Sequence, residues 1–422
     1  MYVKRTIENL LLQLSKSYSC IAVAGPRQTG KSTLIRTLFG ENFSYVTFDD
    51  SQDLALAKAN PNVFLNNYTT PLIIDEIQKC AEILPFIKKR IDDQKFADLH
   101  SKHDNNSASL MFVLSGSNKY ELQKSVAESL AGRCITVELN SFTQCEIAKS
   151  EAQLFAPRIE NLKAVYKTYT KNHTAPSRNA MFERIFRGGM PEFITQQLDK
   201  ETFFKGYVDT YIERDVKGII KASSELQFRL FIELLALRTG NELHYDEISR
   251  AAGIDVKTCK KWLSVLIACG VVMLLRPYKN NANTRIIKAP KLYFLDSGLC
   301  CHLCRCQSAR MLMNGMLAGQ MFETYVISEI FKNWNAFGKD PQNYFFYYRD
   351  SAKREIDLLL VDSQSVTPIE IKSGINPAKA TKNFSVLEKL KLNINEGIVL
   401  DCSEKIRPIN ETAYSVPAFL VG

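Results

Sequence analysis

Short apolar runs alternate with amphipathic runs through the first 140 residues. The apolar runs have the length of buried strands, and the amphipathic runs have the spacing of surface helices. The predicted strands lie at 20–24, 43–48, 71–76, 110–114 and 135–139. The predicted helices lie at 5–16, 34–39, 53–60 and 120–130. The pattern therefore predicts strands and helices in alternation, with the first strand leading directly into a glycine-containing turn.

The rest of the chain changes its pattern three times. Helices are predicted at 142–150 and 203–220, and then a short helix at 245–252 that Gly253 separates from a second helix. Asp255 is placed to cap that second helix and Gly270 to end it. A hairpin follows, with strands at 271–275 and 285–288. The last part predicts a helix at 317–334 and strands at 344–348, 355–361 and 368–372.

The turn after the first strand has the pattern G-x-x-x-x-G-K-[ST], which is a phosphate-binding loop when it joins a strand to a helix. It comprises Gly25, Pro26, Arg27, Gln28, Thr29, Gly30, Lys31 and Ser32, with Thr33 behind it. The glycines let backbone N–H groups face phosphate oxygens, and the helix start adds its positive end. Lys31 would contact the β- and γ-phosphates of ATP, and Ser32 would hold Mg²⁺.

Two further strand ends carry polar residues that suit ATP hydrolysis. The strand at 71–76 ends in Asp75 and Glu76, one carboxylate for the Mg²⁺ shell and one to polarise the attacking water. After the strand at 110–114 comes Ser117, which we predict orients the water or senses the γ-phosphate. Ser115 and Asn118 are the alternatives for that role. The predicted catalytic set is therefore Lys31, Asp75, Glu76 and Ser117.

Composition narrows the class of protein without identifying its function. The 422 residues are 45% hydrophobic and 23% charged, as in ordinary globular proteins, and are long enough for two to four domains. A net charge of +9 suits a polyanionic partner, although solvated lysines give the same number. Eleven scattered cysteines predict reduced thiols, and we find neither a signal peptide nor a membrane-spanning run. The expectation is a cytoplasmic protein with no membrane partner.

The segments Leu-Ile-Ile-Asp-Glu-Ile-Gln at 72–78, Leu-Ser-Gly-Ser at 114–117 and Leu-Ala-Gly-Arg at 130–133 accompany the P-loop. Together they resemble an AAA+ ATPase of the additional-strand class, and most closely the prokaryotic AAA ATPases fused to a C-terminal domain of unknown function. The resemblance covers nearly the whole chain. It implies an α/β fold with a parallel sheet covered by helices on both faces. It also suggests Arg133 as a finger that reaches the γ-phosphate of a neighbouring subunit in a homo-oligomer; the alternative is an ordinary surface or capping arginine.

Residues 141–240 look like a helical lid and connector. The stretch 156–190 is basic, which is typical of a solvated helical face. Its end, Gly188-Gly189-Met190-Pro191, resembles the turn that packs near adenine in related lids, so Pro191 joins the predicted ATP site. Arg214 and Asp215 match an element of the family and suggest no role beyond an ion pair.

The two helices and hairpin at 241–295 predict a winged helix. On the second helix the apolar residues share one face and the lysines occupy the other. Such lysines, with residues of the wing, would contact the phosphates of double-stranded DNA. The candidates are Lys257, Lys260, Lys261, Lys279 and Arg285. The alternative is a protein-binding winged helix whose lysines keep that face soluble.

The last segment, 296–422, resembles the PD-(D/E)XK nuclease fold. Asp357 lies inside an apolar strand, and twelve residues separate it from Glu370 and Lys372, which share one face of the next strand. The resemblance implies that Asp357 and Glu370 bind Mg²⁺, that Lys372 activates water, and that Glu323 is an additional helix acid. No proline precedes Asp357, and many such domains do not cut, so an inactive interaction domain is the alternative.

Residues Cys300 to Cys306 include the spacing of a zinc ligand pair, Cys301-x-x-Cys304. No second ligand pair follows nearby, and small apolar fillers on a short helix are the other interpretation.

The combined prediction is an α/β P-loop NTPase of AAA+ type at 1–140, a lid at 141–240, a winged helix at 241–295 and a nuclease-like domain at 296–422. Its function would be ATP hydrolysis with Mg²⁺, whose nucleotide state controls the attached module on DNA. The alternative is a regulatory switch or scaffold that binds a protein partner through an inactive nuclease-like domain. A small-molecule kinase fits less well, because it would not need the basic winged-helix appendage.

Overall fold

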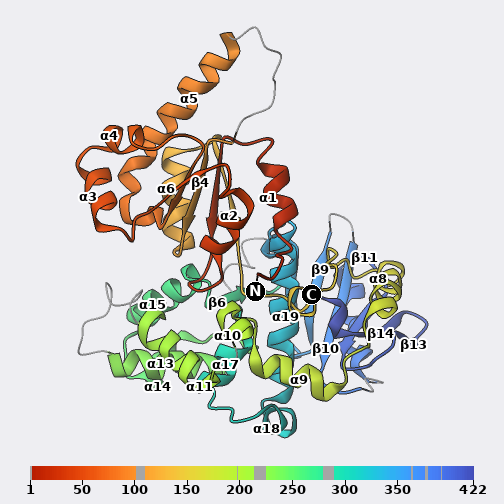
Figure 1. The fold of residues 1–422 in the computed structure, drawn as a ribbon. Helices are drawn as coiled ribbons and strands as arrows, with labels where there is room; N and C mark the ends of the chain where they lie inside the picture. Colours follow the sequence, from red (N-terminus) through yellow and green to blue (C-terminus); the bar gives the residue numbers. More distant parts are fainter. Residues whose placement is uncertain are drawn as a thin grey trace.

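The N-terminal part is a five-stranded parallel sheet with helices on both faces (Figure 1). The computed structural model describes residues 2–100, 110–196, 198–212, 225–278, 289–362, 365–375, 379–390 and 392–422. The strands are β1 (Cys20–Ala24), β2 (Ser44–Thr47), β3 (Leu72–Asp75), β4 (Phe112–Gly116) and β5 (Cys134–Glu138). Their order is β2-β3-β4-β1-β5, and every neighbouring pair is parallel. The α/β prediction is confirmed, and β4 lies between the P-loop strand and the strand that ends in Asp75.

Separate hydrophobic cores form on the two faces of this sheet, because buried strand residues alternate between them. One core includes Ala22 and Leu114, and the other includes Val23 and Val113. The covering segments are α1 (Glu8–Leu14), α2 (Lys31–Phe39), α3 (Ser51–Ala59), α4 (Pro61–Asn66), the 3₁₀ segment η1 (Ile77–Ile83), α5 (Leu84–His100) and α6 (Lys119–Ser129). The strand ends that carry the predicted site therefore stand on a rigid two-sided core.

The connector is helical, as expected. It comprises α7 (Gln144–Ala148), α8 (Ile159–Asn172), α9 (Arg178–Arg187), α10 (Pro191–Gln196), α11 (Lys200–Tyr207), the π-helical turn η2 (Val208–Ile212) and α13 (Glu225–Leu237). The helix predicted at 203–220 begins earlier, at Lys200, because Asp199 accepts a hydrogen bond from Thr202 N at 2.8 Å and caps it. Arg214 and Asp215 lie outside the described residues.

The middle region contains α14 (Tyr245–Ala252), α15 (Val256–Ala268), β6 (Val272–Leu275) and β7 (Lys291–Phe294). Asp255 caps α15 as predicted, accepting from Thr258 N at 2.8 Å. The antiparallel partner of β6 among the described residues is β7, a strand that the sequence analysis did not predict. The predicted strand at 285–288, with Lys279 and Arg285, lies outside the described residues.

The C-terminal part is a mixed sheet around a long helix. After α17 (Ser297–Leu303) and α18 (Ala309–Asn314), α19 (Ala318–Ala336) leads to the sheet of order β13-β14-β12-β10-β9-β8, with β11 beside β10. Its strands are β8 (Phe345–Arg349), β9 (Glu355–Val361), β10 (Ser365–Lys372), β11 (Asn393–Ile394), β12 (Gly397–Asp401), β13 (Arg407–Asn410) and β14 (Ala413–Pro417). Short 3₁₀ segments are η4 (Pro341–Asn343), η5 (Ala380–Leu390) and η6 (Ala418–Leu420).

Helix α19 lies at the centre of one continuous core that runs from Phe155 to Val421. Lid, middle region and C-terminal sheet all contribute to this core, with the sheet on one side of α19 and helices α9 and α17 on the other (Figure 1). Every residue of α19 from 321 to 334 is buried except Glu323, whose side chain is partly exposed, so the helix has no wide free face along which to slide independently. No described helix has the length and apolarity needed to cross a membrane.

Candidate functional site

The P-loop joins β1 to α2, and its lysine points into the loop. Lys31 is buried, and its Nζ donates to the backbone oxygens of Gly25 at 3.0 Å and Pro26 at 2.8 Å. Gly30 caps α2 in the left-handed region, with φ of 85°. A side chain at Gly25 would overlap the backbone carbonyl of Leu139. The ammonium group thus lies within the loop, where a phosphate would exchange for the two carbonyl oxygens.

Asp75 ends β3 in a position that suits the shell of a Mg²⁺ ion. Its side chain is 3% exposed, and both of its oxygens accept hydroxyl hydrogen bonds. Tyr45 donates to Oδ2 at 3.0 Å and Ser115 donates to Oδ1. Burial and the neighbouring Asp75 raise the pKa of Tyr45 to about 12. Together with Ser32 in the first turn of α2, this is an all-oxygen donor set, which is what Mg²⁺ prefers.

Glu76 adopts left-handed backbone geometry, with φ of 57°, at the start of η1. Its Oε2 accepts from the amide of Gln78 and, at 3.4 Å, from the hydroxyl of Ser117. Gln78 Nε2 also lies 3.2 Å from Ser117 Oγ. Of the three candidates after β4, Ser117 lies beside Glu76, Ser115 lies beside Asp75, and Asn118 caps α6. Sequence reasoning missed Gln78, although it stands two residues after Glu76.

A cavity of about 320 Å³ lies beside the P-loop. One wall is Gln28, Thr29, Gly30 and Thr33, and the opposite side includes Pro191 at the start of α10. The cavity therefore brings the predicted adenine-side proline to the predicted phosphate loop. The remaining lining residues were not predicted: Tyr2, Val3, Arg5, Phe142, Glu192, Thr195 and Gln196.

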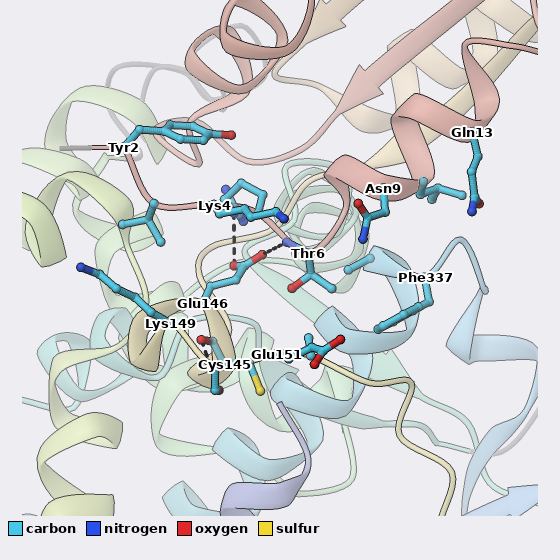
Figure 2. Close-up of a pocket in the computed structure, with 16 residues that line it drawn as sticks. Tyr2, Lys4, Thr6, Asn9, Gln13, Cys145, Glu146, Lys149, Glu151 and Phe337 are labelled. Atoms are coloured by element: carbon cyan, nitrogen blue, oxygen red, sulfur yellow. Dashed lines mark hydrogen bonds and ion pairs between the residues drawn. The ribbon is translucent and has the colours of Figure 1, made fainter. Parts of the chain in front are cut away.

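Arg5 fixes the N-terminal segment to the P-loop. Figure 2 shows the next residue, Thr6, against the carboxylate of Glu146. Its guanidinium donates to the backbone oxygens of Thr29 at 2.9 Å and Asn140 at 2.7 Å. Its Nε lies 3.1 Å from Glu146 Oε2, an ion pair without hydrogen-bond alignment, and Thr6 N donates to Glu146 Oε1 at 2.7 Å. The segment 2–6 also lines a second cavity of about 840 Å³. That larger cavity contains no P-loop residue, so the smaller one is the candidate nucleotide site.

The P-loop also touches the middle region. A Cβ added at Gly270, just before β6, would lie 2.8 Å from Pro26 Cγ. Tyr207 donates to the Arg27 carbonyl at 3.5 Å, and Gln28 Nε2 donates to Glu192 Oε2 at 3.2 Å. Three consecutive P-loop residues therefore contact three different segments: the turn after α15, helix α11 and helix α10.

Arg133 lies at the start of β5 and pairs within its own chain. Its Nε and one terminal nitrogen contact the two Asp92 oxygens at 2.8 and 3.1 Å, and the other terminal nitrogen donates to Ala131 O. The hydrogen bond from Arg133 lowers the pKa of Asp92. A contact with another subunit would have to replace this pair.

The lysines of α15 face solvent, opposite the buried Cys259, Leu263 and Leu266. Lys257, Lys260 and Lys261 are all exposed, and the Lys260 ammonium lies 5.2 Å from the centre of the Tyr245 ring. Trp262 of the same helix is also buried.

The three residues of the nuclease-like motif come together. Lys372 Nζ lies 2.6 Å from Glu370 Oε1 and 3.2 Å from Asp357 Oδ2, which also accepts from Ile371 N at 2.8 Å. Burial and the Asp357 carboxylate raise the pKa of Glu370 to about 7, against the effect of Lys372. The other Glu370 oxygen, Oε2, is buried without a hydrogen-bond partner.

Glu323, the expected helix acid, is bonded to two residues of β7 instead. Its Oε1 accepts from Tyr293 at 2.6 Å and from Lys291 Nζ at 3.1 Å. Burial raises its pKa to about 7, although Lys291 opposes the shift. Sequence reasoning missed both β7 residues; their alternation on one face of an otherwise apolar strand was the available signal.

The donor set of this centre fits a loosely held Mg²⁺. Within the described parts of the chain, no three His, Cys, Asp or Glu side chains are grouped as a metal cage. Mg²⁺ is commonly held by one or two carboxylates, with water and substrate oxygens completing its shell. Asp357 and Glu370 provide the two carboxylates, and the orphaned Oε2 of Glu370 supplies a free lone pair.

The cysteines at 300–306 form two pairs rather than one cluster. The cap of α17 joins Cys306 N to Cys301 O at 2.9 Å, and Arg305 N to His302 O at 2.9 Å, with Arg305 in the left-handed region. This Schellman geometry puts Cys301 against Cys306. Cys300 is buried, its Sγ donates to Ala236 O, and its thiol contacts that of Cys304, which makes the second pair.

Family models match three regions of the chain. Residues 17–148 match an AAA domain, 178–310 a domain of unknown function (DUF8612) and 318–419 a domain of unknown function (DUF4143). The fold and P-loop thus define an AAA-type P-loop ATPase domain, and the chain combines it with a DUF4143-like C-terminal domain. The resemblance inferred from sequence is confirmed to this extent.

Two relatives match nearly the whole chain at low identity. The uncharacterized proteins Mb2031c of Mycobacterium bovis and Rv2008c of Mycobacterium tuberculosis are each 25% identical over 402 residues, 94% of this chain and 80% of theirs. Among solved structures, the Walker-type ATPase PABY2304 of Pyrococcus abyssi is 13% identical with a TM-score of 0.42, covering 72% of this chain and 96% of its own. The ORC2 protein of Aeropyrum pernix is 12% identical with a TM-score of 0.34, covering 72% and 91%.

Proposed function

We propose that this protein is a cytoplasmic Mg²⁺-dependent ATPase whose nucleotide state controls an attached winged-helix and nuclease-like module that acts on DNA. Lys31 and Ser32 would bind the phosphates and Mg²⁺, Asp75 would complete the metal shell, and Glu76 would polarise the water. Ser117, which lies within 3.4 Å of Glu76, would orient that water. Pro191 would border the adenine.

The observation that carries control by nucleotide is the set of contacts around the P-loop. Pro26 packs on Gly270, Arg27 O accepts from Tyr207, and Gln28 donates to Glu192. A loop that closes around phosphates cannot shift without disturbing at least one of these neighbours, because protein interiors are close-packed. Nucleotide binding would thus shift residues of the lid and of the middle region.

A second connection supports control of the nuclease-like domain. Gln144 N in α7 donates to Glu329 Oε2 of α19 at 2.7 Å, and Lys332 Nζ donates to Phe142 O at 3.3 Å. Phe142 lines the nucleotide cavity, and Lys332 is paired with Glu329 at 3.1 Å. Helix α19 therefore contacts the segment that leaves the ATPase sheet, and the same helix carries Glu323.

DNA binding rests on the exposed lysines of α15, and cleavage on the group Asp357, Glu370 and Lys372. A homo-oligomer in which Arg133 reaches a neighbouring γ-phosphate belongs to the same proposal, and it requires Asp92 to release that arginine. The second candidate function is a switch or scaffold for a protein partner. This function is favoured by the ion pairs of Lys372 with Asp357 and with one oxygen of Glu370, because these carboxylates already have a cationic partner without metal.

The test is Mg-ATP hydrolysis by wild type, Lys31→Ala and Glu76→Gln, with and without double-stranded DNA. Loss of a transition-state charge contact or of a general base lowers turnover by about 10²- to 10⁴-fold. Lys79→Ala is the matched control, because this neighbouring lysine only pairs with the exposed Asp49. It should hydrolyse ATP as wild type does.

The outcomes separate the two functions. Stimulation by DNA that disappears in both variants supports the DNA-directed ATPase, and Asp357→Asn then tests cleavage. Hydrolysis that is indifferent to DNA favours the protein-partner switch. Wild type without ATP binding would refute both.

A further inference from the structure

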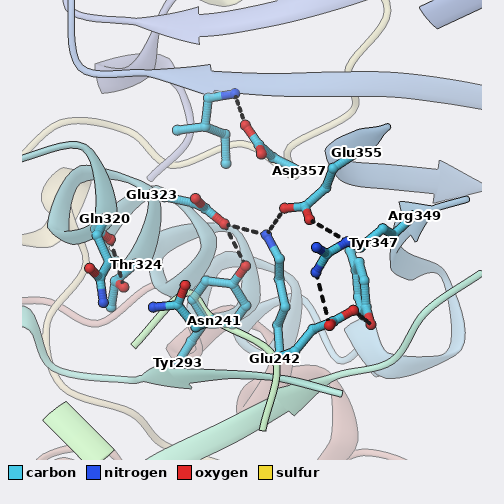
Figure 3. A network of polar contacts seen from close by, with 12 residues as sticks. Asn241, Glu242, Tyr293, Gln320, Glu323, Thr324, Tyr347, Arg349, Glu355 and Asp357 are labelled. Atoms are coloured by element: carbon cyan, nitrogen blue, oxygen red, sulfur yellow. Dashed lines mark hydrogen bonds and ion pairs between the residues drawn. The ribbon is translucent and has the colours of Figure 1, made fainter. Parts of the chain in front are cut away.

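The nuclease-like centre contains a cation that comes from outside its own domain. Lys291, the first residue of β7, reaches Glu323 Oε1 at 3.1 Å and Glu355 Oε1 at 2.6 Å (Figure 3). Glu323 belongs to α19, and Glu355 stands two residues before Asp357 on β9. The side chain of Lys291 is 4% exposed. An ammonium group buried so deeply requires these carboxylates, because desolvation without a partner is very costly.

The lysine occupies the position from which Glu323 would otherwise reach a metal. Glu323 Oε1 is used twice, by Lys291 and by Tyr293, and both donors lie on the same face of β7. Asp357 and Glu370 are left as a group of two, with Lys372 between them. The third acid is therefore present beside the centre but held by the middle region.

The side chains around this centre carry more negative than positive charge, which favours binding of a further cation. Five carboxylates meet in this network: Glu242, Glu323, Glu355, Asp357 and Glu370. Among the residues that the structure describes, three permanent cations face them, Lys291, Arg349 and Lys372, and His244, which is charged only when protonated, lies 3.9 Å from Glu242. When all five carboxylates are ionised, two negative charges remain uncompensated, which matches one divalent ion.

Lys291 is also connected to the P-loop by a short path. Gly270, which packs on Pro26, stands two residues before β6. In the antiparallel pair of β6 and β7, Leu275 lies opposite Lys291. A displacement of the P-loop at Pro26 would thus pass through one two-stranded ribbon to the lysine.

We propose that Lys291 is a resident counter-ion that competes with a divalent cation for the acids of the nuclease-like centre, and that the β6–β7 ribbon lets the nucleotide loop set this competition. The inference rests on the proposed function, since it assumes that Asp357 and Glu370 bind metal. With β7 in place, Glu323 is neutralised and metal binds weakly. With β7 displaced, Glu323 becomes a third acid, and the centre gains affinity for Mg²⁺ or Mn²⁺.

The test is thermal unfolding of the full chain with and without Mn²⁺, without nucleotide. Lys291→Met should lower the Tm in the absence of metal, because it leaves Glu323 and Glu355 buried without their cation. Mn²⁺ should restore much of that loss, with an apparent affinity more than about tenfold above wild type. Lys291→Arg keeps the charge and should bind Mn²⁺ as weakly as wild type.

Lys332→Met is the matched control. Lys332 is 3% exposed and also pairs with a glutamate of α19 at 3.1 Å, but Glu329 lies away from the centre. This variant should lose stability without recovering it in Mn²⁺. Equal rescue of Lys291→Met and Lys332→Met, or rescue of neither, would overturn the inference.

Asp357→Asn separates the inference from the function on which it rests. If Mn²⁺ shifts the Tm of wild type and Lys291→Met equally, and Asp357→Asn abolishes both shifts, the metal site stands and the role of Lys291 is refuted. If no Mn²⁺ shift depends on Asp357, the metal-binding part of the proposed function fails.

The nucleotide link has its own measurement. The Asp357-dependent Mn²⁺ affinity, compared with and without saturating ADP, should change in wild type and stay constant in Lys291→Met. Subtracting the Asp357→Asn titration removes any metal bound with the nucleotide. Equal changes in both proteins, or no change in wild type, would show that Lys291 does not carry the coupling.

Discussion

Replacing Arg5 with methionine tests whether the N-terminal segment is a fixed wall of the nucleotide cavity. Arg5 is 5% exposed, and it holds the P-loop carbonyl of Thr29, the carbonyl of Asn140 and the carboxylate of Glu146. Methionine fills a similar volume but offers none of these contacts. The change therefore removes the anchor with little loss of apolar packing.

The cost can be worked from what the substitution leaves behind. Removing one partner of a buried ion pair costs about 3–5 kcal/mol. Glu146 keeps two backbone donors, Thr6 N at 2.7 Å and Thr143 N at 3.0 Å, so the lower end applies. About 3 kcal/mol corresponds to an increase of roughly 100-fold in the opening of the segment, because each 1.4 kcal/mol is a factor of ten.

Hydrogen exchange reads this opening directly. The Thr6 amide donates to Glu146, so its exchange should accelerate by roughly 100-fold in Arg5→Met, while amides of the central strand β4 should stay protected. ATP affinity should fall as well, since Tyr2, Val3 and Arg5 line the cavity. Arg133→Met is the control, because its pair with Asp92 is about one-third exposed and far along the chain. Thr6 exchange within about threefold of wild type would refute the anchoring argument.

Two further predictions concern the middle region. Cys306 should be the first cysteine that iodoacetamide alkylates, and its alkylation rate should rise through about pH 7. The reason is that the hydrogen bond from Cys301 and the charge of Lys200 lower the pKa of Cys306 to about 7. Mass spectrometry with Cys304 as the internal comparison measures this, and faster labelling of Cys304 contradicts it. If the α15 lysines contact phosphates, alanine at Lys257, Lys260 and Lys261 should lower the slope of the logarithm of DNA affinity against the logarithm of salt concentration by about one unit per lysine. Alanine at the exposed Lys163, Lys167 and Lys171 of α8 changes the charge equally and should leave that slope unchanged.

The nucleotide half was predictable because its signals are local. A strand, a glycine loop and a helix follow one another within twenty residues, and Asp75 and Glu76 end a strand whose apolar run is unmistakable. The sheet order then brings these strand ends to one edge. The role of Arg5 could not be predicted, because its partners lie 24 and 135 residues away and no local motif surrounds it.

Strand β7 was not predicted, because its sequence begins with a charged residue. The apolar pair Ile286-Ile287 attracted the prediction, whereas β7 begins with Lys291, a residue that is rarely buried. Among the described residues, the carboxylates of Glu323 and Glu355, 32 and 64 residues further on, pair with that lysine inside the protein, and Asp357 adds its charge. A buried charge is explained by its tertiary partners, which the local pattern does not contain.

Two paths from the nucleotide cavity end on the same helix. One runs from Pro26 through Gly270 and the β6–β7 ribbon to Glu323, and the other runs from Arg5 through Glu146 and α7 to Glu329. Glu323 and Glu329 are six residues apart on α19, about 9 Å along its axis. Because most of α19 is buried, a local distortion is poorly absorbed by bending into solvent. The helix would move as a body by the 1–2 Å typical of packed helices, and both ends would report the same nucleotide state. Both paths therefore converge on α19, and the β6–β7 ribbon is the one that ends at Lys291 and the acid centre.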